Sequence, residues 1–154
     1  MYPAKEVSQE MANPVRGGWK RLKKVTRFVK SRRSVVWEFP WQEECSELKS
    51  YADSDWGGRR GSRKSTSGGL VMLGKHCIKT WSSTQGAVAL SSAEAEFYAM
   101  IEAVARSKGI LSVAREFVFL VIDKVQLSTD SSAAKSFASR TGLGRMKHLE
   151  IRDL

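Results

Sequence analysis

Acidic residues stand at the ends of three apolar or alternating stretches. Asp53 ends the stretch LKSYAD, Asp130 follows VQLST, and Glu96 lies near the start of a helix expected after QGAVAL. All three have small residues close by in the sequence, namely Ala52, Ser54, Ala93, Ala95, Ser131 and Ser132. Small neighbours leave room for a bulky anionic substrate and for hydrated cations. The three carboxylates are therefore candidates for one site.

Carboxylates that converge without a counterion repel one another, and at least one of them takes up a proton. A divalent cation reverses this effect. Mg²⁺ prefers oxygen ligands and keeps waters and substrate phosphates in its shell. Two such ions can activate a water and stabilise the leaving oxygen in phosphodiester cleavage. The sequence has no cluster of His and Cys that would favour zinc.

Spacing alone leaves alternatives open. Asp130 is also a candidate cap for the helix that follows it. Asp55 would share a strand face with Asp53, because residues two apart point the same way. Glu94 and Glu96 point about 200° apart on a helix, so only one of them can face a shared site.

The elements that must position these acids follow from periodicity. Alternating stretches predict strands over residues 48–53, 69–73 and 77–81, with a hairpin turn at Gly74 and Lys75. An extended piece is expected over 85–90. A helix is expected from Ser91 or Ser92 to about 106, and a second helix over 108–118 follows it after little or no break. A strand over 125–129 and a helix from Ser131 or Ser132 to 138 come next. This pattern predicts a mixed α/β sheet with flanking helices.

The first 47 residues differ in character. Helices are expected over residues 4–12 and 15–30, the second with apolar residues at helical spacing and basic residues elsewhere, and a short strand over 34–39. The acidic, turn-like stretch 40–47 marks a boundary. We therefore expect two parts, residues 1–47 and residues 48–154.

The net charge of +10 is spread unevenly along the chain. Residues 11–37 hold nine Lys or Arg and no Asp or Glu. Such a balance favours anionic partners, nucleic acid before acidic membranes. No apolar run approaches the roughly 18–20 residues of a membrane span, so no membrane partner is expected. The first residues lack the apolar core of a signal peptide, which predicts an intracellular protein.

Several blocks of the sequence resemble one family. YADSDWGG over residues 51–58, RRGSRKSTSGGLVML over 59–73, IKTWSSTQGAVALSSAEAEFYAM over 78–100, LSTDSSAA over 127–134 and RMKHLEIRDL over 145–154 are similar to the ribonuclease H domain of copia-type retrotransposon Pol polyproteins. MANPVRGGWKRLKKVTRFVKS over residues 11–31 resembles the end of the preceding reverse transcriptase and its connection. The blocks cover most of the chain in the family's order.

The resemblance implies a ribonuclease H-like fold, with a three-strand antiparallel meander and a parallel strand. It also implies which acids bind metal, namely Asp53, Glu96 and Asp130. The D-S-D-W-G turn favours Asp53 over Asp55, which becomes a candidate for indirect support of the site. The E-A-E-F pattern places Glu96 in the site and leaves Glu94 as a first-turn residue favoured by the helix dipole.

The activity implied is Mg²⁺-dependent hydrolysis of the RNA strand of RNA–DNA hybrids, with two ions in the complete site and Mn²⁺ as an alternative. The family's complete domain adds a fifth strand and a final helix that supplies a fourth acid. Neither Glu150 nor Asp153 matches that motif, so we expect an incomplete domain. The alternative function is a fragment that binds nucleic acid without cutting it.

Basic residues near the first acid and on the basic helix are the expected phosphate contacts, and the upstream reverse transcriptase is an expected partner. The residues are Arg59, Arg60, Arg63, Lys64, Lys20, Lys24 and Arg27. A solvated helix face is the alternative for the last three. His148 is a second candidate for indirect support of the site, with a surface histidine as its alternative. Trp56 and Trp81 are aromatic residues that could stack on bases, although Trp81 fits a core position better.

Overall fold

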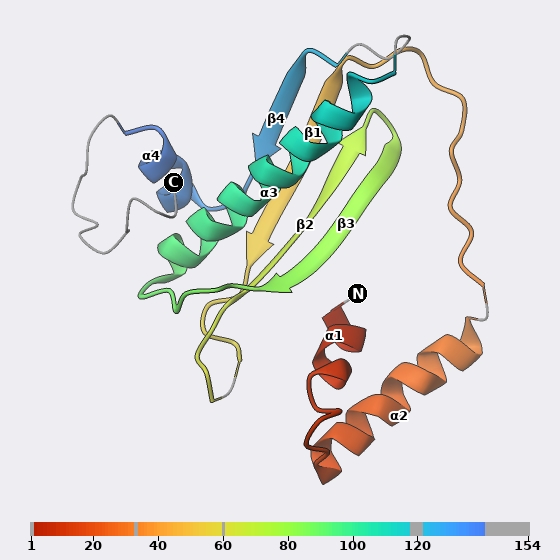
Figure 1. The fold of residues 1–154 in the computed structure, drawn as a ribbon, viewed down its shortest axis with the longest axis vertical. Helices are drawn as coiled ribbons and strands as arrows, with labels where there is room; N and C mark the ends of the chain where they lie inside the picture. The colour runs from red at the N-terminus through yellow and green to blue at the C-terminus, as the bar shows by residue number, and fades with distance from the viewer. Residues whose placement is uncertain (1, 33, 60, 118–121, 141–154) are drawn as a thin grey trace. The chain divides into compact units, whose positions relative to one another are not determined.

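The computed structural model describes residues 2–32, 34–59, 61–117 and 122–140 (Figure 1). The chain separates into two compact units, Met1–Phe39 and Pro40–Leu154. None of the helices in the described residues is long and apolar enough to cross a membrane.

The first unit consists of two helices, α1 (Tyr2–Ser8) and α2 (Arg16–Ser31). Glu10, in the connection between the two helices, forms an ion pair with Arg21 of α2 and lies against the buried Gly18 of the same helix. These contacts fix the connection against α2. The strand predicted over residues 34–39 is wrong. Val35 and Val36 are 76% and 77% exposed, and the segment has no regular structure. β-branched and aromatic residues favour a strand only where a partner strand and a packing surface are present.

The second unit is built on a four-stranded sheet. Its strands are β1 (Glu47–Ser54), β2 (Thr66–Leu73), β3 (His76–Thr84) and β4 (Lys124–Ser128), in the spatial order β3-β2-β1-β4. β2 pairs antiparallel with both β1 and β3, whereas β4 runs parallel to β1. This confirms the predicted antiparallel meander with one added parallel strand.

One face of the sheet is covered by the helix α3 (Ser92–Ala114) (Figure 1). Along β1, Leu48, Ser50 and Ala52 are buried and alternate with exposed residues, as expected for a strand with one covered face. Ala99 and Ala103 of α3 belong to the same core. The alanines allow the helix to lie close to the sheet.

The two helices predicted with little or no break between them form a single helix, α3. Ser107 is fully buried and donates its hydroxyl to the Ala103 carbonyl at 2.8 Å, which satisfies it inside the helix. Ile110 and Leu111 then pack against the core and keep the next turns helical. The helix α4 (Ser132–Ala138) packs on α3, where Phe137 meets Phe97 edge-on at 4.5 Å between ring centres.

Two other segments bear on the site. Residues 85–90, expected to be extended, form bends and join no strand of the sheet. Gln42 lies beside the β2–β3 turn, donates to the Leu73 carbonyl at 3.0 Å and accepts from the Lys75 N–H at 2.7 Å. These bonds place the start of the second unit several residues before β1.

Candidate metal centre

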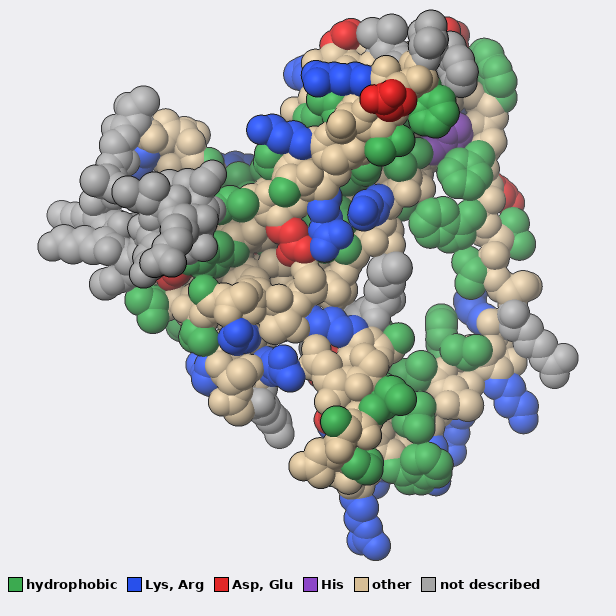
Figure 2. Space-filling model, viewed as in Figure 1, with side chains coloured by type: hydrophobic (Ala, Val, Ile, Leu, Met, Phe, Trp, Pro, Cys, Tyr) green, Lys and Arg blue, Asp and Glu red, His purple; other side chains and the backbone are tan. Residues whose placement is uncertain are grey.

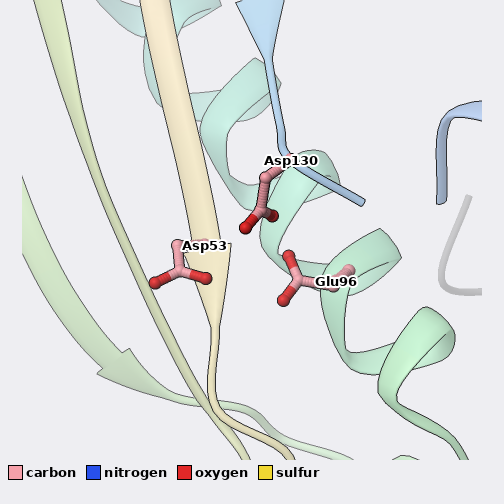
Figure 3. Close-up of side chains that lie close together, drawn as sticks. All are labelled: Asp53, Glu96 and Asp130. Atoms are coloured by element: carbon pink, nitrogen blue, oxygen red, sulfur yellow. The ribbon is translucent and has the colours of Figure 1, made fainter. Parts of the chain in front are cut away.

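Three carboxylates converge at one end of the sheet (Figure 3). Each of Asp53, Glu96 and Asp130 offers one oxygen, and these oxygens all lie within 4.8 Å of one another. The parallel register explains why the two aspartates meet. Tyr51 of β1 pairs with Ser128 of β4, so the residues two positions further along each strand direction stand side by side.

Glu96 reaches the same point from α3. Ser91 caps that helix by accepting the Glu94 N–H at 3.1 Å, which fixes where the helix begins. Glu96 therefore lies in the second turn, facing the ends of β1 and β4 (Figure 3). The Ser54 backbone N–H donates to Glu96 Oε1 at 3.2 Å and orients the carboxylate.

The second oxygen of Glu96 shows that the site suits a cation. Glu96 Oε2 is buried and accepts no hydrogen bond from the described residues. Burial raises the pKa of Glu96, hydrogen bonding to Ser54 opposes this rise, and the nearby Asp53 and Asp130 add to it. A buried acceptor beside two further carboxylates matches the oxygen-rich ligand set that a hard divalent cation prefers. The residues present therefore fit a divalent metal ion.

The site is open to solvent on its other side. Asp53 and Asp130 are both exposed. Gly68 lies opposite Asp53 in the antiparallel pair, so no side chain stands across from this aspartate. An anionic group as large as a phosphodiester can therefore approach the carboxylates.

The neighbouring acids have other partners. The Asp55 carboxylate accepts the Thr66 backbone N–H, and its own N–H donates to the Thr66 carbonyl at 3.1 Å. This aspartate thus closes the loop between β1 and β2. Glu94 is buried and accepts the Leu90 N–H at 2.8 Å, in addition to its N–H bond to Ser91. Glu94 therefore fixes the turn that leads into α3.

The predicted phosphate contacts fall in two places. Arg59, Arg63 and Lys64 lie on the loop between β1 and β2, where Figure 2 shows basic side chains gathered at the end of the sheet that carries the acids. Lys20, Lys24 and Arg27 are exposed on α2 in the other unit. Arg60 and His148 lie outside the described residues.

Two residues near the site were not settled by the sequence. Ser54 acts through its backbone N–H, and no side-chain pattern identifies a backbone donor. Trp56 lies on the loop after β1 and donates its indole N–H to the Ala89 carbonyl at 3.1 Å. Trp81, by contrast, is buried in the core beneath the Arg106 guanidinium, which is 5.2 Å from its ring centre.

Known proteins similar to this chain include an effector protein and two transposon polyproteins. The "Secreted RxLR effector protein 161" of Plasmopara viticola is 39% identical over 97 residues, which are 63% of this chain and 68% of that protein. The "Retrovirus-related Pol polyprotein from transposon RE2" of Arabidopsis thaliana is 28% identical over 151 residues, 97% of this chain and 10% of the polyprotein. That from transposon TNT 1-94 of Nicotiana tabacum is 27% identical over 151 residues, 95% of this chain and 11% of the polyprotein.

Among solved structures, ribonuclease H1 of the archaeon Halobacterium salinarum NRC-1 matches with a TM-score of 0.39 and 23% identity, covering 62% of this chain and 64% of that one. No protein-family model matches. The chain spans about a tenth of the length of the transposon polyproteins it matches.

Proposed function

Because the homologues of this chain over 95–97% of its length are retrovirus-related Pol polyproteins from transposons, we propose that it is their ribonuclease H-type part and that it hydrolyses the RNA strand of RNA–DNA hybrids. The observation that carries this proposal is the convergence of Asp53, Glu96 and Asp130 within 4.8 Å. Two of these acids end neighbouring parallel strands, and the third comes from the helix across them.

In this proposal the three carboxylates hold Mg²⁺, with Mn²⁺ as an alternative. The bound cation would lower the pKa of a water and neutralise charge on the phosphate. Hydrolysis adds the water oxygen to phosphorus and breaks the bond to the 3′ oxygen, which takes a proton. The products then carry a 5′-phosphate and a 3′-hydroxyl, as expected from the resemblance.

The protein's own residues orient and tune this site. The Ser54 N–H holds Glu96, so the carboxylate does not have to be ordered when the cation binds. Because the pKa of Glu96 is raised, this residue competes for a proton at a higher pH than an ordinary glutamate does. Metal binding and cleavage are therefore expected to weaken as the pH falls through the pKa of Glu96.

Substrate affinity would come from the basic residues. Arg59, Arg63 and Lys64 lie on the loop that follows Asp53, where an incoming phosphate backbone would pass. The cations of α2 would add further phosphate contacts. Such contacts supply affinity and salt dependence and carry no sequence preference. We further propose an intracellular location and an upstream reverse transcriptase as partner, in keeping with the polyprotein context.

The test is cleavage of a labelled RNA–DNA hybrid in Mg²⁺ by the full chain and two variants. Asp130→Asn removes one candidate ligand at an exposed position, and Asp123→Asn is its control, an exposed aspartate outside the acidic cluster. We expect the wild type and the Asp123→Asn variant to cut the RNA strand and the Asp130→Asn variant to show only background cleavage.

Equal cleavage by the Asp130→Asn variant would refute the assignment of the site. A wild-type chain that binds the hybrid and leaves it uncut in both Mg²⁺ and Mn²⁺ would support the alternative function, which is nucleic-acid binding without catalysis. The net charge of +10 favours binding in either case.

A further inference from the structure

Trp56 is an exposed aromatic side chain whose position is nevertheless fixed. It is 54% exposed, although its indole N–H donates to the Ala89 carbonyl at 3.1 Å. The hydrogen bond ties one edge of the ring to the segment before α3 and leaves much of the ring surface open to solvent. A large exposed aromatic ring of this kind contributes little to the core, so its exposed surface is available for a ligand.

The loop that carries Trp56 is anchored at its base. On one side of Trp56, Asp55 exchanges hydrogen bonds with Thr66. On the other side, the Gly57 N–H donates to the Ser65 hydroxyl at 3.0 Å, and Gly57 takes a φ of +59° that few other residues adopt. Trp56 is therefore held in place before any ligand binds, which lowers the entropic cost of binding.

A guanidinium group lies next to the residue that follows Trp56. A Cβ atom built on Gly57 would lie 3.4 Å from Arg63 Nη2, so the Arg63 head group is beside the residue that follows Trp56. Arg63 has a φ of +56°, and its backbone N–H donates to the Arg59 carbonyl at 2.9 Å. The planar guanidinium offers donors in the geometry that a phosphate accepts.

The same place adjoins the acidic cluster. Ser54, which donates to Glu96, precedes Trp56 by two residues, so their Cα atoms are at most about 7 Å apart. Val88 and Leu90 flank the Ala89 carbonyl and are both exposed, which adds apolar surface near the ring. An aromatic face, apolar neighbours and a cation together match the chemistry of one nucleotide, with a flat base and a charged phosphate.

We propose that Trp56 and Arg63 form a subsite for an unpaired nucleotide beside the cleavage centre. The base stacks on the Trp56 ring, and Arg63 binds a phosphate of the same strand. The ligand is an unpaired nucleotide because the faces of bases inside a duplex are already stacked on their neighbours. In a single strand these faces are free to stack on an aromatic side chain. This subsite rests on the proposed function and adds to it a preference for hybrids that continue into single-stranded RNA.

The test compares a blunt RNA–DNA hybrid with one that carries a single-stranded RNA overhang. Binding to the full chain is measured by fluorescence anisotropy, with Ca²⁺ replacing Mg²⁺ to suppress cleavage. We expect the wild type to bind the overhang hybrid about 5- to 150-fold more tightly than the blunt one, the range for one stacked base. Trp56→Ala should remove this preference. Trp56→Phe, which keeps a ring and loses the indole N–H, should retain most of it.

Trp41→Ala is the matched control, because Trp41 lies in the same unit and is 85% exposed. It should keep the full preference for the overhang. Arg63→Ala should weaken the preference for the overhang and lower the salt dependence of overhang binding by about one phosphate contact. Thermal unfolding of each variant shows whether the fold is retained.

Two results would overturn the subsite. One is a wild-type chain without preference for the overhang, and the other is a folded Trp56→Ala variant that keeps it. Cleavage of the blunt hybrid in Mg²⁺ distinguishes failure of the subsite from failure of the proposed function, because cleavage requires the acidic cluster and does not require a base stacked on Trp56. A chain that binds neither hybrid would refute both proposals.

Discussion

Glu96→Gln should stabilise the metal-free protein and remove most of its stabilisation by Mg²⁺. The substitution keeps an oxygen that can accept the Ser54 N–H, so the hydrogen bond to Glu96 Oε1 has a replacement. It removes a half-buried negative charge that two other carboxylates repel. It also removes a charged oxygen from the set that would hold the cation.

The size of the effect follows from the geometry. Two unit charges 4.8 Å apart repel by about 0.9 kcal/mol in water and by about 3.5 kcal/mol at an effective dielectric constant of about 20. Asp53 and Asp130 are exposed, so solvent screening brings the total for both pairs toward the lower end, about 1–2 kcal/mol. For a unit of this size, that raises Tm by about 3–10 °C.

Binding of Mg²⁺ should raise the stability of the wild type. A ligand that binds only the folded state at about 100 times its Kd adds about 2.7 kcal/mol of stability. We therefore expect the Tm values to cross, with the Glu96→Gln variant more stable in EDTA and the wild type more stable in Mg²⁺. Thermal unfolding by circular dichroism, with and without Mg²⁺, measures both. Glu116→Gln, at an exposed position on the same unit, is the control and should behave as the wild type does.

The pH dependence of stability tests whether removing the charge of Glu96 stabilises the metal-free protein. In the metal-free protein, the raised pKa of Glu96 means that the folded state binds its proton more tightly than the unfolded state does. The contribution of Glu96 to stability is therefore largest below pH 4.5, the ordinary pKa of a glutamate, and is lost as the pH rises through the raised pKa of Glu96 in the folded state. The advantage of the Glu96→Gln variant should shrink as the pH is lowered through this range.

Two outcomes would refute this reasoning. A Glu96→Gln variant that is less stable than the wild type in EDTA would mean that the charged carboxylate stabilises the fold. An equal gain in Tm for both proteins on adding Mg²⁺ would mean that the cation binds elsewhere.

Three further predictions concern the fold and the basic loop. Gly69→Ala should destabilise the protein by about 2 kcal/mol or more in chemical denaturation, because a Cβ there would overlap Trp81 and the Tyr51 carbonyl, whereas Gly86→Ala, with open space around it, should change stability little. Ser91→Ala should cost about 1 kcal/mol by removing the cap of α3, while Ser92→Ala should not, and equal losses would show that Ser91 does not act as the cap. Arg59→Ala should weaken hybrid binding and reduce the slope of log K against log salt concentration by about one, with an unchanged slope contradicting a phosphate contact.

The strands and the helix caps were predictable because their signals are local. Alternation identified β1, β2, β3 and β4 to within a few residues, and Ser91 and Ser131 cap the helices that they were expected to begin. The convergence of three acids followed from where these elements end. The direction of β4 relative to β1 came from the resemblance, since no local pattern fixes which strands pair.

The errors arose where tertiary contacts decide. Two successive helices were predicted where α3 is one continuous helix, because Ile110 and Leu111 pack against the core and keep the next turns helical. The reverse holds for residues 34–39, whose strand-forming composition has no partner strand in the described part of the chain. The support of Glu96 by a backbone N–H was also beyond sequence reasoning, because every residue except proline carries one.

The parallel pairing of β1 with β4 has a consequence for how the protein folds. The two strands that carry Asp53 and Asp130 are separated in the chain by β2, β3 and α3, so their pairing closes the longest loop in the sheet. Contacts of such long range form late, after the local hairpins and the helix. The acidic cluster is then completed near the end of folding, and its mutual repulsion opposes only the last steps. A cation bound there should accordingly slow unfolding far more than it accelerates folding.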